Sequence, residues 1–167
     1  GILPLITGSL VVTLGAALIA VPFGVGTAVY ISEIAPRWMR EILKPLVELL
    51  GGLPSVVLGF LGILVLAPFL RVFLDLPTGL TAFTGSLLLG GIAVPTVVSV
   101  AEDALDSVPR AYREGAWALG ATKWQTIWRV TLPAAKSGVL TAIMLGVGRA
   151  IGETMTVMMV TGNAPVL

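Results

Sequence analysis

Residues 1–32 are GILPLITGSLVVTLGAALIAVPFGVGTAVYIS, and none of them is charged. A helix needs about 20 apolar residues to cross the hydrocarbon core of a bilayer. The stretch begins without basic residues and is longer than the apolar part of a signal peptide, so it does not fit a cleaved leader. It therefore predicts a membrane-spanning helix.

Three further stretches have the same character. Residues 49–70 and 76–101 are uncharged, and residues 137–163 are interrupted only by Arg149 and Glu153. Lipid offers no hydrogen-bond partners to the backbone, so each stretch is expected to form a helix rather than a strand. The four predicted spans lie near residues 3–31, 51–70, 82–101 and 137–161.

The composition supports a membrane protein and excludes several other classes. The chain of 167 residues is 56% hydrophobic and 11% charged, against about 25% charged in an average soluble domain. It has no cysteine and no histidine, which excludes thiol nucleophiles, disulfides, His-based catalysis and zinc sites built on Cys or His. Its net charge of +1 would not attract nucleic acid. We therefore expect no catalytic residue, no metal site and no nucleic-acid partner.

The basic residues indicate the orientation of the chain. Eight of the ten lie in the connectors between spans one and two and between spans three and four. Basic connectors stay on the cytoplasmic side, so both connectors are predicted to be cytoplasmic. These eight residues are Arg37, Arg40, Lys44, Arg110, Arg113, Lys123, Arg129 and Lys136.

The first cytoplasmic connector, residues 36–50, has apolar residues at helical spacing and charged residues mostly elsewhere. It is expected to be either an interfacial helix that turns into span two or a solvated connector.

The second cytoplasmic connector, residues 102–136, has the pattern of a helix–glycine–helix elbow. Gly120 interrupts the first helix, Thr122 can cap a second short helix, and Pro133 ends the segment. Its apolar side chains either dock into another protein or pack under the chain's own helices, and spacing alone leaves both alternatives open. They are Trp117, Trp124, Ile127 and Trp128.

Seven residues of this elbow form a spaced motif. They are Glu114, Gly115, Ala116, Gly120, Val130, Leu132 and Pro133. The motif resembles the EAA signature of binding-protein-dependent ABC importer permeases, with Gly115 in place of the middle alanine and Val130 in place of isoleucine. The resemblance implies a coupling helix in which residues 114–116 and Gly120 contact a cytoplasmic ATPase, while Leu132 and Pro133 set the return to the membrane.

A second resemblance narrows the solute. Residues 148–155, GRAIGETM, and 160–165, VTGNAP, are similar to the phosphate permeases of the PstC type, as are residues 20–24, 30–33 and 53–57. The resemblance implies an all-α, MetI-like permease core with four spans and a coupling elbow, in a multi-pass protein of the prokaryotic cytoplasmic (inner) membrane. Residues 1–167 would then be a single transmembrane domain that lacks a helix at each end.

The same resemblance implies the partners. They are a second homologous permease subunit, a dimer of cytoplasmic ATP-binding subunits, an extracytoplasmic phosphate-binding protein and the lipid bilayer. The chain has no G-x4-G-K-[ST] loop for ATP, so we expect a transport subunit without a cofactor of its own, and hydrolysis of ATP by the ATPase.

Arg149 and Glu153 are the charges within the fourth predicted span. A charge at the bilayer centre costs about 2.5–3.5 kcal/mol, so two charges in one span indicate a structural or a functional role. Their i, i+4 spacing allows them to pair. They either neutralise each other at a helix contact or face a water-filled path, where Arg149 would attract phosphate oxygens and Glu153 would hold the guanidinium. Thr154 and Thr156 would add hydroxyl donors.

Several alternatives remain open from the sequence. The elbow fits permeases for other oxyanions, such as molybdate or sulfate, and the partner phosphate permease of the PstA type has a related Arg-Glu motif. An intramembrane protease would need a nucleophile–base pair or two facing aspartates, for which the spans offer only Glu153. A purely structural helix bundle would not account for the spacing of the elbow.

Overall fold

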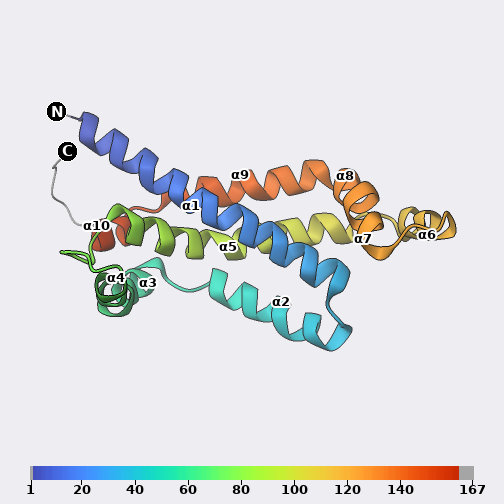
Figure 1. Ribbon diagram of the computed structural model, residues 1–167, viewed down its shortest axis with the longest axis horizontal. Coiled ribbons are helices and arrows are strands. Elements are labelled where there is room, and N and C mark those ends of the chain that lie inside the picture. The colour runs from blue at the N-terminus through green and yellow to red at the C-terminus, as the bar shows by residue number, and fades with distance from the viewer. Residues whose placement is uncertain (1, 162–167) are drawn as a thin grey trace.

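The computed structural model describes residues 2–161, and this part of the chain is helical with no strand. It forms an elongated bundle with the elbow at one end (Figure 1). The elements, including three π-helical turns labelled η, are α1 (Leu3–Val29), η1 (Tyr30–Ile34), α2 (Arg37–Gly51), α3 (Ser55–Leu61), η2 (Gly62–Leu66), α4 (Ala67–Phe73), α5 (Ala82–Asp106), α6 (Arg110–Ala118), α7 (Lys123–Thr126), η3 (Ile127–Thr131), α8 (Leu132–Ala134), α9 (Lys136–Gly152) and α10 (Met155–Thr161).

Helix α5 is the centre of the bundle. Its N-cap is Thr81, whose side chain accepts a hydrogen bond from the Thr84 backbone N–H at 3.2 Å. The helix packs against α1, α2, α9 and α10. Leu89 and Ala93 of α5 lie in one buried cluster with Ala16 of α1 and Ala150 of α9. Small residues let these helices approach closely, which membrane helices use in place of hydrophobic collapse.

Two glycines, one on α1 and one on α9, accommodate Val97 of α5. A Cβ atom at Gly24 of α1 would lie 2.6 Å from Val97 Cβ, and one at Gly146 of α9 would also collide with Val97. The three helices therefore meet at a point where only glycine fits on α1 and α9.

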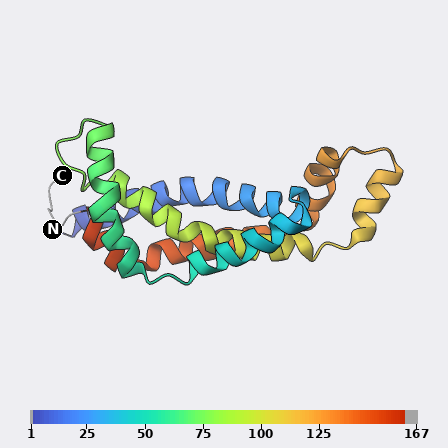
Figure 2. The ribbon, with the colours of Figure 1, turned by 90° about the horizontal axis from the view of Figure 1, so that it is seen from below.

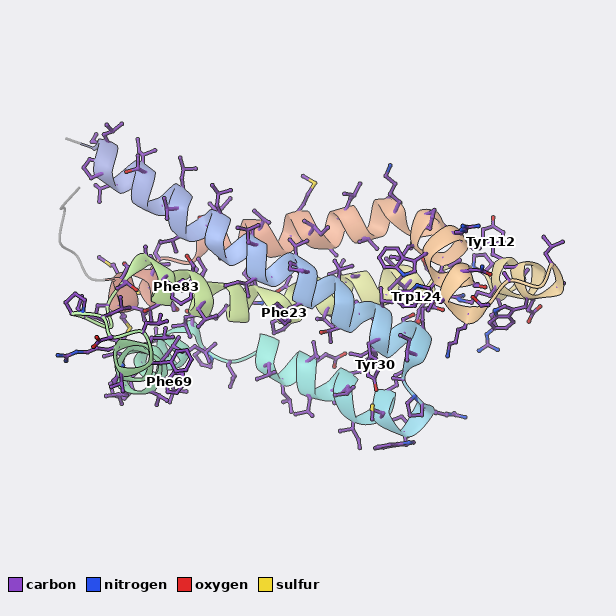
Figure 3. All side chains as sticks on the ribbon, viewed as in Figure 1. Phe23, Tyr30, Phe69, Phe83, Tyr112 and Trp124 are labelled. Atoms are coloured by element: carbon purple, nitrogen blue, oxygen red, sulfur yellow. The ribbon has the colours of Figure 1, made fainter. Side chains whose placement is uncertain are left out.

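The outer surface is apolar, as a lipid environment requires. Leu10, Leu14 and Leu18 of α1 are each more than half exposed. Figure 3 shows side chains projecting outward along the whole bundle, with Phe69 and Phe83 near one end and Tyr112 at the elbow end. This surface fits a protein whose helices contact lipid or other membrane helices.

Three of the four predicted spans are confirmed by length and hydropathy, with shifted bounds: Leu3–Ile34, Ser55–Phe73 and Ala82–Asp106. The fourth differs from the expected single helix over 137–161, because α9 ends at Gly152 and α10 begins at Met155. A fourth candidate span arises only if the pair Lys123–Ala134 and Lys136–Gly152, bent by 74°, is counted as one. Residues 162–165 of the phosphate-permease motif lie outside the described part of the chain.

The first connector is a helix, as expected, but it does not lie across the spans. Helix α2 runs along the bundle beside α5, whereas the segment from α3 to α4 crosses the long axis (Figures 1 and 2). Leu43 and Val47 pack against the buried cluster around Ala101. One face of α2 finds partners on η1 and α5, whereas the apolar residues of its helical pattern remain about half or more exposed, as Trp38, Ile42 and Leu49 show.

The contact around Val97 gives a prediction about stability. Gly24→Ala is expected to lower the stability of the protein in detergent by about 1–3 kcal/mol, the usual cost of overpacking a core. Gly26→Ala is the matched control on the same helix, since a Cβ there meets nothing within 4 Å. Thermal unfolding of both variants measures the effect. Equal midpoints would contradict the packing at Val97.

Candidate functional site

Two interrupted helices meet in the body of the protein. Helix α2 ends at Gly51, and α3 begins at Ser55 after Pro54, which has no N–H to continue a helix. Helix α9 ends at Gly152, Glu153 takes an extended backbone conformation, and α10 begins at Met155. The interruptions are neighbours because α3 packs on α10. Non-helical backbone at membrane depth is tolerated where protein buries it or where it lines a cavity.

Arg149 lies at this junction and is partly buried. Its Nη1 donates to Thr96 Oγ1 of α5 at 2.9 Å, and its Nη2 donates to the Gly51 carbonyl oxygen of α2 at 2.9 Å. The carbonyl of Gly51 lies at a helix C-terminus, where a cation is favoured. Arg149 therefore joins three helices through dipolar groups.

The expected pair between Arg149 and Glu153 is not formed. The helix stops between the two residues, so the i, i+4 geometry that would bring them together is lost. Glu153 Oε1 instead accepts from the Thr156 hydroxyl at 3.3 Å and lies 3.5 Å from the Thr156 backbone N. The carboxylate thus supports the start of α10, because the first N–H groups of a helix have no partner inside it.

Thr154 and Thr156, which the sequence analysis suggests as hydroxyl donors to the solute, differ in their exposure. Thr156 is buried, and its hydroxyl also donates to the Ser55 carbonyl oxygen at 2.9 Å. It joins α10 to α3 and is not free to serve a solute. Thr154 is exposed in the interruption itself.

The elbow has the predicted helix–glycine–helix geometry. Gly120 has a φ of +81°, a conformation that favours glycine. Thr122 accepts from the Gln125 backbone N–H at 3.2 Å, and the Gln125 side chain accepts from the Thr122 N–H at 2.9 Å. This reciprocal capping box confirms Thr122 as the cap of the second helix.

Most of the motif residues around α6 are exposed. Glu114, Gly115 and Gly120 are exposed, and a Cβ atom added at either glycine would meet nothing within 4 Å. Ala116, Val130 and Leu132 are partly buried, whereas Pro133 is exposed. Packing within the described part of the chain therefore does not require a small residue at position 115 or 120.

The tryptophans of the elbow also point outward. Trp117, Trp124 and Trp128 are each at least half exposed, and the last two meet edge to face. Only Ile127 of the four predicted anchors is buried. The indole rings thus do not pack under the chain's own helices.

Ion pairs hold the elbow end of α2 against α5. Lys44 Nζ lies 2.7 Å from Glu102 Oε2 and 3.3 Å from Asp103 Oδ1. Glu102 is buried, and its Oε1 has no hydrogen-bond partner in the described structure. The hydrogen bond with Glu102 is the main cause that raises the pKa of Lys44, and burial opposes it. Lys44 therefore stays charged at neutral pH and compensates the buried carboxylate.

Sequence reasoning missed the partners of the charged residues. Thr96 and the Gly51 carbonyl lie far from Arg149 in sequence, and no periodicity links them to it. The Gly51-Gly52-Leu53-Pro54 stretch carried a usable signal, since glycine and proline disfavour a continuous helix. This stretch predicts that the helix is interrupted after Gly51, but it does not predict that Arg149 lies against the interruption.

Comparison with known proteins defines the class. The profile of the family described as "Binding-protein-dependent transport system inner membrane component" matches residues 20–166. The chain belongs to this family.

Individual relatives agree with that assignment. The chain is 48% identical, over its whole length, to a protein named probable ABC transporter permease protein YqgH of Bacillus subtilis, of which it covers 54%. It is 36% identical over 95% of its length to the phosphate transport system permease protein PstC of Pasteurella multocida, and 39% identical over 97% to PstC 1 of Mycobacterium tuberculosis. It covers 56% and 54% of these proteins, so the chain spans about half the length of the relatives it matches.

A solved structure confirms the fold. A chain of the MetNI methionine ABC transporter, in an inward-facing conformation, superposes with a TM-score of 0.69 over 91% of this chain and 68% of its own length. The sequence identity is 24%. The expected all-helical, MetI-like architecture is therefore correct.

Proposed function

We propose that the chain is the core of a permease subunit of an ATP-driven importer of inorganic phosphate. The observation that carries this proposal is the position of Arg149 where two helices are interrupted. The ion pairs found within residues 2–161 all involve other residues. The positive charge of Arg149 is therefore not neutralised by a carboxylate in this part of the chain and is available to an oxyanion. The names of the PstC relatives support phosphate as that oxyanion.

Arg149 would bind the solute through donors that it does not use within the protein. A guanidinium has five N–H donors in a planar fork that matches two oxygens of a phosphate. Thr96 and the Gly51 carbonyl each occupy one nitrogen and fix the plane. Thr154 would supply a hydroxyl. Glu153 would add a nearby negative charge that keeps the anion from binding too tightly to leave.

The exposed elbow would couple this path to ATP hydrolysis. Glu114, Gly115, Ala116 and Gly120 would contact a cytoplasmic ATPase, and residues 130–133 would hold the return to α9. The exposure of the tryptophans and the open space at both glycines support a docking surface. ATP would be bound by the partner, and the chain would need no cofactor.

The complete transporter would contain further proteins. We propose a second homologous permease subunit, a dimer of ATP-binding subunits and an extracytoplasmic phosphate-binding protein. The family description, which names a binding-protein-dependent system, supports the last of these.

The solute is tested by uptake of radiolabelled phosphate into vesicles that contain the complete transporter. Unlabelled phosphate is expected to compete, whereas sulfate and molybdate at the same concentration are not. Competition by sulfate or molybdate, without uptake of phosphate, would assign the permease to another oxyanion.

The role of Arg149 is tested by a charge swap. Arg149→Glu combined with Glu153→Arg is expected to insert and assemble but not to transport, because Arg149 interacts with Thr96 and Gly51 and not with Glu153. Arg149→Lys is expected to lower uptake at least about tenfold, equivalent to 1.4 kcal/mol, since one ammonium cannot reproduce the fork. Wild-type uptake by the doubly substituted protein would mean that Arg149 and Glu153 act only as an ion pair and have no role in the transport path.

The docking surface is tested by Gly115→Leu and Glu114→Arg. Both are expected to lower ATPase association in a pull-down at least about tenfold, or 1.4 kcal/mol, because a leucine fills the proposed contact and an arginine reverses its charge. Gly26→Leu is the matched control, an exposed glycine with open space around it on α1. Undiminished association in both elbow variants would refute docking through this surface.

A further inference from the structure

Helix α6 of the elbow is joined to the long helices by the side chain of one arginine. Helix α6 stands away from the long helices (Figure 2), and its main neighbours are α7 and η3, which belong to the elbow itself. No residue of α6 is buried. A movement of α6 therefore needs a specific link in order to reach the membrane helices.

Arg113 provides such a link. Its Nη2 donates to Glu33 Oε1 at 2.5 Å and its Nε to Glu33 Oε2 at 3.2 Å, which is the two-pronged geometry of a strong Arg–carboxylate pair. Nη1 also donates to the Val108 carbonyl oxygen at 2.8 Å, and Nη2 to that of Leu105 at 2.9 Å. One side chain thus connects α6 with η1 and with the end of α5.

This ion pair is shielded from water, unlike an ordinary surface pair. The side chains of Arg113 and Glu33 are 14% and 7% exposed. Arg37 and Glu41, by contrast, form an i, i+4 pair on α2 that is 94% and 68% exposed. Exposed pairs contribute little and tolerate movement, whereas a buried pair resists separation because each charge would lose its partner without regaining water.

The segment that carries Glu33 leads to the proposed solute site. Glu33 lies in η1, a π-helical turn that continues α1, and such wide turns are frequent at functional sites. Ile31 of η1 is buried in one cluster with Leu105 of α5. Further along α1, Ala16 and Ala20 pack in a cluster with Ala150, the neighbour of Arg149. A rigid α1 thus connects the elbow with the helix interruption.

We propose that the buried Arg113–Glu33 pair transmits movement of the elbow to α1 and α5, so that both residues are positioning residues of transport coupling. This inference rests on the proposed function of the elbow. Residue 113 lies beside the motif residue Glu114, which is exposed. Adjacent positions on α6 therefore face different surroundings, with the exposed Glu114 on the proposed ATPase surface and Arg113 in contact with the bundle.

The test uses the complete transporter reconstituted in liposomes. Glu33→Gln removes the charge and Arg113→Lys removes the two-pronged geometry, while Glu41→Gln and Arg37→Lys are the matched controls in the exposed pair. ATPase association, ATP hydrolysis and phosphate transported per ATP hydrolysed are measured for assembled complexes. In both Arg113 and Glu33 variants, association and hydrolysis are expected to persist while phosphate per ATP falls at least about fivefold, the lower end of typical coupling factors. The controls are expected to match the wild type.

Other outcomes overturn the proposal. An unchanged ratio of phosphate to ATP in both variants would mean that Arg113 only holds the elbow in place. Failure of Arg113→Lys to insert or assemble would assign the pair to folding and not to coupling. If Gly115→Leu and Glu114→Arg leave ATPase association intact, the proposed function of the elbow fails instead, and that result is distinct because it does not involve Arg113 or Glu33.

Discussion

The rest of the structure depends on one constraint, that backbone polar groups inside a membrane must find partners within the protein. Long helices satisfy it by themselves, so each interruption needs a compensating side chain. Arg149 donates to the Gly51 carbonyl at the end of α2, Glu153 supports the start of α10, and Thr156 joins α10 to the Ser55 carbonyl of α3. Arg149, Glu153 and Thr156 therefore lie where helices stop.

The position of these residues at the helix interruptions links the stability of the fold to the proposed transport path. A guanidinium held by dipoles keeps its net charge, whereas one held by a carboxylate would be neutralised. The interruption also leaves Thr154 exposed. Arg149 and Glu153, which compensate the broken helices, are thus also groups that an oxyanion would meet in the proposed path, and close packing around Val97 holds α1, α5 and α9 against one another.

The elbow end of the protein differs from the spans, because it carries many charged residues that water can solvate. The charged side chains that face the bundle are paired and at least partly shielded, as with Arg113 and Glu33 or with the half-exposed Lys44 and the buried Glu102. Those on the outer face, such as Glu114, are exposed. The elbow therefore has one side that contacts the chain itself and one exposed side on which we propose that the ATPase docks.

The sequence by itself determined the helical membrane fold, three of the spans and the geometry of the elbow, because these depend on hydropathy over about 20 residues and on local signals such as Gly120 and Thr122. Only the tertiary structure decided the partners of Arg149, the break at Glu153 and the direction of α2. An i, i+4 spacing assumes a continuous helix, and whether the helix continues depends on contacts such as Thr156 with Ser55 from a segment 101 residues away. The Arg113–Glu33 pair joins residues 80 apart, so only the packing of α1 against α5 brings them together.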